Sequence, residues 1–156
     1  MKFIIENIMS TRKRIIDRVS LIEVDELIKM PEPWTNNVLW QLGHIVTAQQ
    51  VLCYKNANVP ILIPDYFIPA FKKGSSPKDW TETPSTQVVL HYLETTADAL
   101  WEDYQSGKFN NYSSYLTSAG VMLTSIDEAL MFNYSHENLH FGNIMIMDKY
   151  LQKKSR

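Results

Sequence analysis

The distribution of proline restricts the fold of this chain more than any other feature of its sequence. Five of the seven prolines lie between residues 60 and 84, and long proline-free stretches lie on either side. Proline breaks helices because it lacks the backbone N–H and clashes with the preceding turn. Only five glycines occur in 156 residues. The pattern therefore indicates long helices interrupted by one large connection.

Apolar residues recur at intervals of three and four in the first half of the chain, which is the period of an amphipathic helix. They predict a helix over residues 2–20 and a short turn of helix near 24–29. A second long helix is expected to begin after Asn36 or Asn37, since asparagine is a good N-cap, and to run to about Lys55. Apolar side chains surround most of this helix, so we expect it to be the most buried one.

The second half of the chain predicts two further long helices. One starts at residues 84–86, where proline and serine suit a helix entry, and ends near Gly107. The other starts near Thr124, with Asp127 as the partner in a reciprocal cap, and ends near Leu151.

The connection over residues 57–83 is much longer than the usual link between antiparallel helices. Extended chain of this length could run back along a whole helix, which would leave the second and third helices parallel. We therefore expect an all-α fold in one domain over residues 1–156: a four-helix bundle, up-down-down-up, with one crossover. The connection is rich in aromatic residues and is expected to pack over one end of the bundle.

Charge and composition exclude several classes of protein. The 15 Lys and Arg residues against 17 Asp and Glu residues offer no broad cationic face, which disfavours nucleic-acid binding. The single cysteine, Cys53, excludes an internal disulfide. Glu6 interrupts any signal-peptide core, and no apolar run is long enough to cross a membrane. We expect a cytoplasmic protein with no membrane partner.

The fourth helix carries a core-facing stripe whose middle is polar. Burying amides and imidazoles in a bundle seam is unfavourable unless partners satisfy them. His136 and His140 lie four apart on one helical face, which is the local geometry for chelating one metal ion. The stripe is Met122, Ile126, Ala129, Asn133, His136, His140, Asn143 and Met147.

Residues 136–140 also match the H-E-x-x-H pattern of zinc metalloproteases. Their context does not fit, because Asn143 and Ile146 stand where one protease class needs glycine and histidine. No glutamate follows Glu137 to supply the third ligand of the other class. The third ligand must come from upstream.

Two upstream histidines are available. His91 lies on the polar face of the third helix and is expected to be an ordinary surface residue. His44 lies on a helix with little polar surface, and beside a two-histidine face in the same bundle it is the better candidate ligand. Gly43 and Gly142 lie next to these candidates, and each either allows a close backbone approach or makes an ordinary helix contact.

The segments Asn37, Trp40-Gln41-Leu42-Gly43-His44 and His136-Glu137-Asn138-Leu139-His140-Phe141-Gly142 resemble the DinB-like (DinB/YfiT) family of metal-dependent enzymes. The resemblance covers nearly the whole chain, including the long second connection. It implies an up-down-down-up four-helix bundle, commonly dimeric. It also implies a divalent metal ion held by His44, His136 and His140. Imidazole ligands suit zinc, nickel, iron and copper alike, and zinc and nickel are the favoured ions.

Members of this family include thiol-dependent S-transferases and a thiol-dependent isomerase. The resemblance thus implies a metal-dependent transferase or related hydrolase that acts on a small molecule, with a low-molecular-weight thiol as a possible co-substrate. Glu137 is a candidate catalytic base if it turns toward the metal, and otherwise a solvated helix glutamate.

Two other functions stay open: a non-catalytic, stress-related metal or ligand binder and, less favoured, a zinc metalloprotease. A homodimer is expected because Trp101 adds apolar surface beyond what one bundle needs. Substrate is expected to enter near the 31–37 turn, past Trp34 and Trp40.

Overall fold

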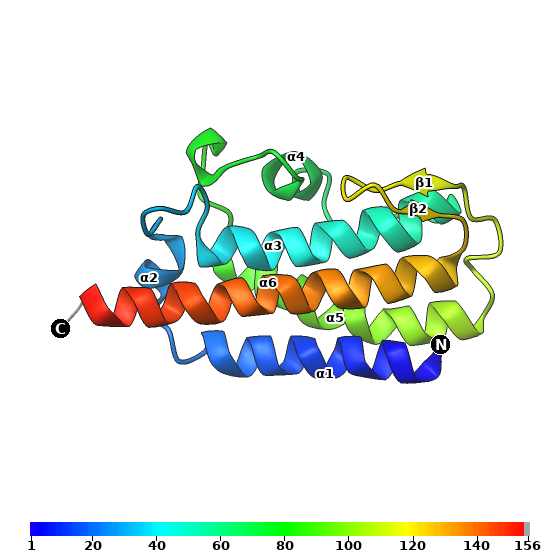
Figure 1. The fold of residues 1–156 in the computed structure, drawn as a ribbon, viewed down its shortest axis with the longest axis horizontal. Helices are drawn as coiled ribbons and strands as arrows, with labels where there is room; N and C mark the ends of the chain where they lie inside the picture. The colour runs from blue at the N-terminus through cyan, green and yellow to red at the C-terminus, as the bar shows by residue number, and fades with distance from the viewer. Residues whose placement is uncertain (155–156) are drawn as a thin grey trace.

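The computed structural model describes residues 1–154 and is mostly helical, which confirms the predicted class (Figure 1). One departure from an all-α fold is a small antiparallel hairpin before the last helix. The helical elements are α1 (Lys2–Val19), α2 (Val24–Ile28), α3 (Val38–Gln49), η1 (Gln50–Tyr54), η2 (Lys55–Ala57), α4 (Phe67–Phe71), η3 (Pro77–Asp79), α5 (Thr86–Gln105) and α6 (Ile126–Lys154). The strands of the hairpin are β1 (Tyr115–Leu116) and β2 (Met122–Leu123).

Four long helices lie side by side along the molecule. The helix α1 packs against α5 and α6, and α3 packs against the same two helices on its own side. The colour gradient in Figure 1 shows α1 and α6 running toward the left of the view, and α3 and α5 running toward the right. The chain returns from the end of α3 to the start of α5 through residues 58–85, along the outside of α3.

Side-chain caps fix where the long helices begin. The Asn37 carboxamide oxygen accepts from the Trp40 amide at 2.8 Å, as expected for the predicted N-cap of α3. The predicted reciprocal cap between Thr124 and Asp127 is wrong. The Ser125 hydroxyl accepts from the Glu128 amide, and the Glu128 carboxylate accepts from Thr124. The longer glutamate side chain reaches back across the first turn, so α6 begins at Ile126.

The predicted second helix does not continue as a regular α-helix to Lys55. Its last turns widen into the π-helix η1 and then tighten into the 3-10 turn η2. The Gln50 carboxamide in η1 accepts from the Leu62 amide at 2.7 Å, which ties the returning chain to this irregular turn. The helix ends at Asn58, whose φ of 57° lies in the left-handed region.

Only part of the aromatic connection lies toward an end of the bundle, where Trp80 lines a pocket with Ile28, Met30 and Asn37. The preceding part lies against a helix face instead. It forms α4, which lies beside α3 (Figure 1), and Phe67 and Phe71 are fully buried there. Large rings bury the most apolar surface where they can pack against a whole helix face. As predicted, α3 is heavily buried, with eleven of its twelve residues inside.

Two clusters of buried apolar side chains form the core. One surrounds Leu42 and Phe71, and the other surrounds Leu52 and Leu100. Within residues 1–154, no helix combines the length and the apolar character needed to cross a membrane.

Candidate metal centre

Three histidines from two neighbouring helices come together beside α4. His44 comes from α3, and His136 and His140 come from α6. The Nε2 atom of His136 lies 3.3 Å from that of His44 and 3.1 Å from that of His140. One ligand atom from each residue falls within 4.8 Å of the others. His91, by contrast, is exposed on α5, as predicted.

The His44 ring is fixed by two contacts. Its Nδ1 atom lies 2.7 Å from the Phe71 carbonyl oxygen, which can only accept a hydrogen bond. The proton is therefore on Nδ1, and Nε2 presents its lone pair to the other histidines. The ring also stacks on Trp40, with centroids 4.6 Å apart and planes 9° apart. His44 is 7% exposed, in keeping with its predicted burial.

The His140 ring is oriented by Gln41. The His140 Nδ1 atom donates to the Gln41 carboxamide oxygen. The Gln41 amide nitrogen donates in turn to Asn36 at 2.8 Å, which fixes the direction of the carboxamide. His140 thus also carries its proton on Nδ1 and presents the Nε2 lone pair.

His136 has less support than the other two histidines. Its side chain is only partly buried, although its Nδ1 atom is shielded from solvent. Among the described residues, this Nδ1 atom has no hydrogen-bond partner. The nearest roughly parallel ring is that of Phe132, with centroids 6.3 Å apart.

Burial keeps these imidazoles neutral. It lowers the pKa of His44, an effect that the Phe71 carbonyl partly offsets. Burial, the larger cause, and electrostatic repulsion from the neighbouring His44, the smaller cause, lower the pKa of His136 to about 4. Burial, followed by His136 and His44, lowers the pKa of His140 to about 3. Three neutral imidazoles with their Nε2 atoms facing one another form the donor set that divalent transition metals bind, and a cation between them removes their mutual repulsion.

Glu137 lies inside the bundle, where it forms an ion pair with Arg12. Its two carboxylate oxygens accept from Arg12 Nη2 at 2.8 Å and Nε at 3.1 Å, and Asn133 donates to one of them at 2.7 Å. Both charged side chains are fully buried. Arg12 uses its remaining nitrogen on the Thr96 hydroxyl and the Leu93 carbonyl of α5. The solvated-glutamate alternative is therefore wrong, whereas the role of Glu137 as a base stays a prediction.

The predicted seam of α6 has the correct period but some wrong members. Glu137 and Ile144 are buried where His136 and Asn143 were expected, and Met122 lies in β2, exposed. The charge on Glu137 hid its seam position, because a glutamate is normally solvated. The signal that could have revealed the pair is on α1, where Arg12 occupies a buried stripe with regular spacing. That stripe is Ile5, Ile8, Arg12, Ile15 and Val19.

Gly43 allows the close approach that was one of its two predicted roles. A Cβ atom at this position would lie 2.4 Å from the Phe71 ring, so the missing side chain is what admits Phe71. Neither predicted role applies to Gly142, which is exposed with open space around its α-carbon. Sequence reasoning did not find Phe71 or Gln41 as partners of the histidines, since a backbone carbonyl and a helix amide leave no signature in the sequence.

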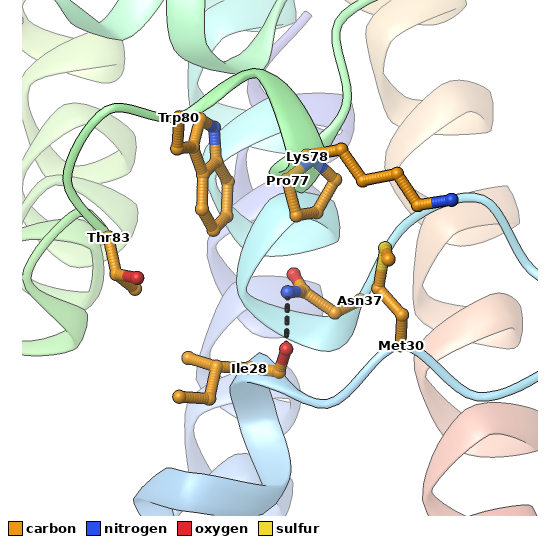
Figure 2. A pocket seen from close by; sticks show the side chains of 7 residues that line it. All are labelled: Ile28, Met30, Asn37, Pro77, Lys78, Trp80 and Thr83. Atoms are coloured by element: carbon orange, nitrogen blue, oxygen red, sulfur yellow. Dashed lines mark hydrogen bonds between the residues drawn. The ribbon is translucent and has the colours of Figure 1, made fainter.

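A pocket of about 220 Å³ lies near the 31–37 turn, where the substrate entrance was expected. Figure 2 shows Trp80 and Pro77 on one side of the pocket and Ile28 on the other. The Asn37 side-chain nitrogen donates a hydrogen bond to the Ile28 carbonyl. Neither Trp34 nor Trp40 lines it, because Trp34 packs on Tyr150 and Trp40 stacks on His44. A larger hollow of about 580 Å³ lies around Trp80 and Tyr66. The candidate ligands line neither space.

Comparison with known proteins agrees with the resemblance seen in the sequence. A family model described as the DinB superfamily matches residues 8–144, a range that contains all three histidines. A search of curated proteins found no match. Since the family model spans most of the chain, the protein belongs to the DinB superfamily.

Proposed function

We propose that this protein is a divalent-metal-dependent enzyme, with His44, His136 and His140 as ligands on an up-down-down-up four-helix bundle. Zinc or nickel is the proposed ion, and a low-molecular-weight thiol or a water molecule is the proposed nucleophile. The reaction would be thiol-dependent S-transfer to a small molecule or a related hydrolysis. The observation that carries the proposal is the convergence of three neutral Nε2 atoms from α3 and α6.

The number of ligands favours a catalytic site over a structural one. Structural zinc sites use four protein ligands, whereas catalytic sites use three and keep a position for water or substrate. The two apolar clusters also give the bundle a core that does not depend on a metal. When bound, a divalent cation lowers the pKa of a coordinated thiol or water, which supplies a nucleophile at neutral pH.

The protein's own residues would orient the centre. The Phe71 carbonyl and the Gln41 carboxamide hold two imidazoles in the tautomer that leaves Nε2 available. Cys53 is fully buried, and burial raises the pKa of its thiol, an effect that the nearby Glu137 adds to. A reacting thiol would therefore come from a second substrate rather than from the chain.

One observation favours the non-catalytic binder as a second candidate. The Glu137 carboxylate is held by Arg12, so it is not free to act as a base at the centre. The same contact weakens the metalloprotease hypothesis, because the glutamate of H-E-x-x-H must face the metal-bound water there. Metal-activated thiol chemistry needs no such base, which keeps the transferase ahead of both.

The decisive experiment combines metal analysis with a substrate screen. The protein is purified without a nickel column, and its metal content is compared with that of His44→Ala. A metal content equal in both proteins would contradict the proposed site. The metal-loaded protein is then incubated with low-molecular-weight thiols and electrophiles, and thioether products are followed by mass spectrometry. Metal-dependent product formation is expected. A spectral change at the metal without product in any reaction would favour the binder.

A homodimer is proposed on a separate observation. Three large apolar residues, Met131, Leu139 and Ile146, are exposed on one side of α6. By the helical repeat they share one side of the helix, where exposed apolar side chains could pack against a second copy. Light scattering should give twice the 18.1 kDa mass of the chain, and Leu139→Lys should halve it. A monomer over a wide concentration range would contradict the proposal.

A further inference from the structure

The three histidines of the centre are not equivalent, and the difference lies at their Nδ1 atoms. His44 donates to the Phe71 carbonyl, and His140 donates to Gln41. The Nδ1 atom of His136 is shielded from solvent and has no partner among the described residues. His136 and His140 lie one turn apart on the same helix, so the surroundings of their Nδ1 atoms can be compared directly.

The missing partner weakens any bond that His136 makes through Nε2. An imidazole that binds a cation through one nitrogen carries a proton on the other, and the cation makes that N–H a stronger donor. A buried donor without an acceptor is unfavourable, and this penalty falls on His136 alone. For His44 and His140 the stronger Nδ1–H donor is favourable, because each already has a hydrogen-bond acceptor in place.

Orientation of the rings leads to the same conclusion. His44 is held by stacking on Trp40, and Gln41 is itself fixed by Asn36. Apart from the other two ligands, the ring described beside His136 is the more distant Phe132, and the His136 side chain is the most exposed of the three. It can therefore leave the centre with the least disturbance of its surroundings.

We infer that His136 is the exchangeable ligand of the metal centre, and that His44 and His140 are its anchors. The inference rests on the proposed three-histidine site and adds an order to its ligands. An incoming donor replaces His136 first, at the side of the centre that is nearest to solvent.

Affinity measurements on matched variants test this order. Binding of Zn²⁺ is measured by competition with a chromophoric chelator for His44→Ala, His136→Ala and His140→Ala, with His91→Ala as the control for loss of a surface histidine. We expect His136→Ala to lose much less affinity than either anchor variant. Gln41→Leu should lower the affinity by about 10- to 100-fold, and Gln41→Glu, which keeps an acceptor for His140, should restore it.

A spectroscopic measurement supplies a second readout that does not depend on activity. With Co²⁺ in place of Zn²⁺, added imidazole should restore the wild-type visible spectrum in His136→Ala and fail to do so in the two anchor variants. Equal losses of affinity at all three positions, or a larger loss at His136, would overturn the inference. Wild-type protein that binds neither ion would overturn the proposed site itself. If an alanine variant does not fold, as judged by circular dichroism, the glutamine variant at that position replaces it.

Discussion

Phe71 supports the candidate centre through both its aromatic ring and its backbone carbonyl. Its ring occupies the space left by the absent side chain of Gly43, and its carbonyl accepts from His44. These contacts fall on consecutive residues of α3, so the position of the ring is linked to the position of the carbonyl. A change at Gly43 would thus be felt at the metal without touching any ligand.

Substitution of Gly43 by alanine tests this link. The added Cβ would clash with the Phe71 ring at 2.4 Å. We expect a loss of about 1–3 kcal/mol in the free energy of unfolding from overpacking, together with weaker metal binding as the Phe71 carbonyl moves. The control is Gly142→Ala, where nothing lies within 4 Å. It should stabilise the helix by up to about 1 kcal/mol. Equal effects of the two substitutions on metal binding would contradict the link.

The buried thiol of Cys53 provides a second prediction at this scale. Burial raises the pKa of this thiol, and the thiolate is the reactive form. A chromogenic disulfide reagent should therefore leave Cys53 unmodified in the native protein at neutral pH. One thiol per chain should react after denaturation. Rapid labelling of the native protein would show that η1 opens and would make Cys53 a candidate nucleophile.

At the scale of elements, the pair of Arg12 and Glu137 joins α1 to α6 and, through Thr96, to α5. Removing one partner of a buried ion pair leaves an uncompensated charge. We expect Glu137→Gln to lower the free energy of unfolding by about 3–5 kcal/mol, and the double variant Arg12→Leu/Glu137→Leu to recover most of it. Urea denaturation in the presence of a chelator measures the free energy of unfolding of each variant without a contribution from bound metal.

The exposed pair of Lys2 and Glu6 on α1 supplies the control. Glu6→Gln should change the free energy of unfolding by less than about 1 kcal/mol. A similarly small effect of Glu137→Gln would contradict a structural role of the buried pair. The expected loss of stability also means that reduced turnover in Glu137→Gln does not by itself identify a base. Turnover must be compared at a temperature at which the variant is fully folded.

The positions of the helices could be predicted from the sequence more accurately than the identity of the side chains that they bury. Asn37 and Ser85 are strong caps, and they place the starts of α3 and α5 where they were expected. The phase of α6 could not be read from apolar residues alone, since Glu137 is buried only because Arg12 arrives from another helix. The supports of the histidines at Phe71 and Gln41 depend on tertiary packing for the same reason.

At the scale of the whole molecule, the candidate centre borders one apolar cluster through Trp40 and Phe71, but both clusters are built from apolar side chains rather than from metal ligands. Because two apolar clusters hold the helices together, we expect a chelator to leave the far-ultraviolet circular dichroism unchanged at 25 °C. Metal should nevertheless raise the melting temperature, since a ligand that binds only the folded state at 100 times its Kd adds about 2.7 kcal/mol of stability. Loss of helical signal on chelation would instead indicate a structural metal.

The histidines that meet at the centre are far apart along the chain. His44 and His136 are separated by 92 positions, and Gln41 and His140 by 99. Contacts of such long range are costly to form, because the entropy of closing large loops must be overcome. His136 and His140 are neighbours within one helix, but the third nitrogen arrives only when α3 docks on α6. If the proposed centre holds an ion, all three ligands can bind it only after α3 has docked on α6, so metal occupancy would report that the two halves of the chain have met.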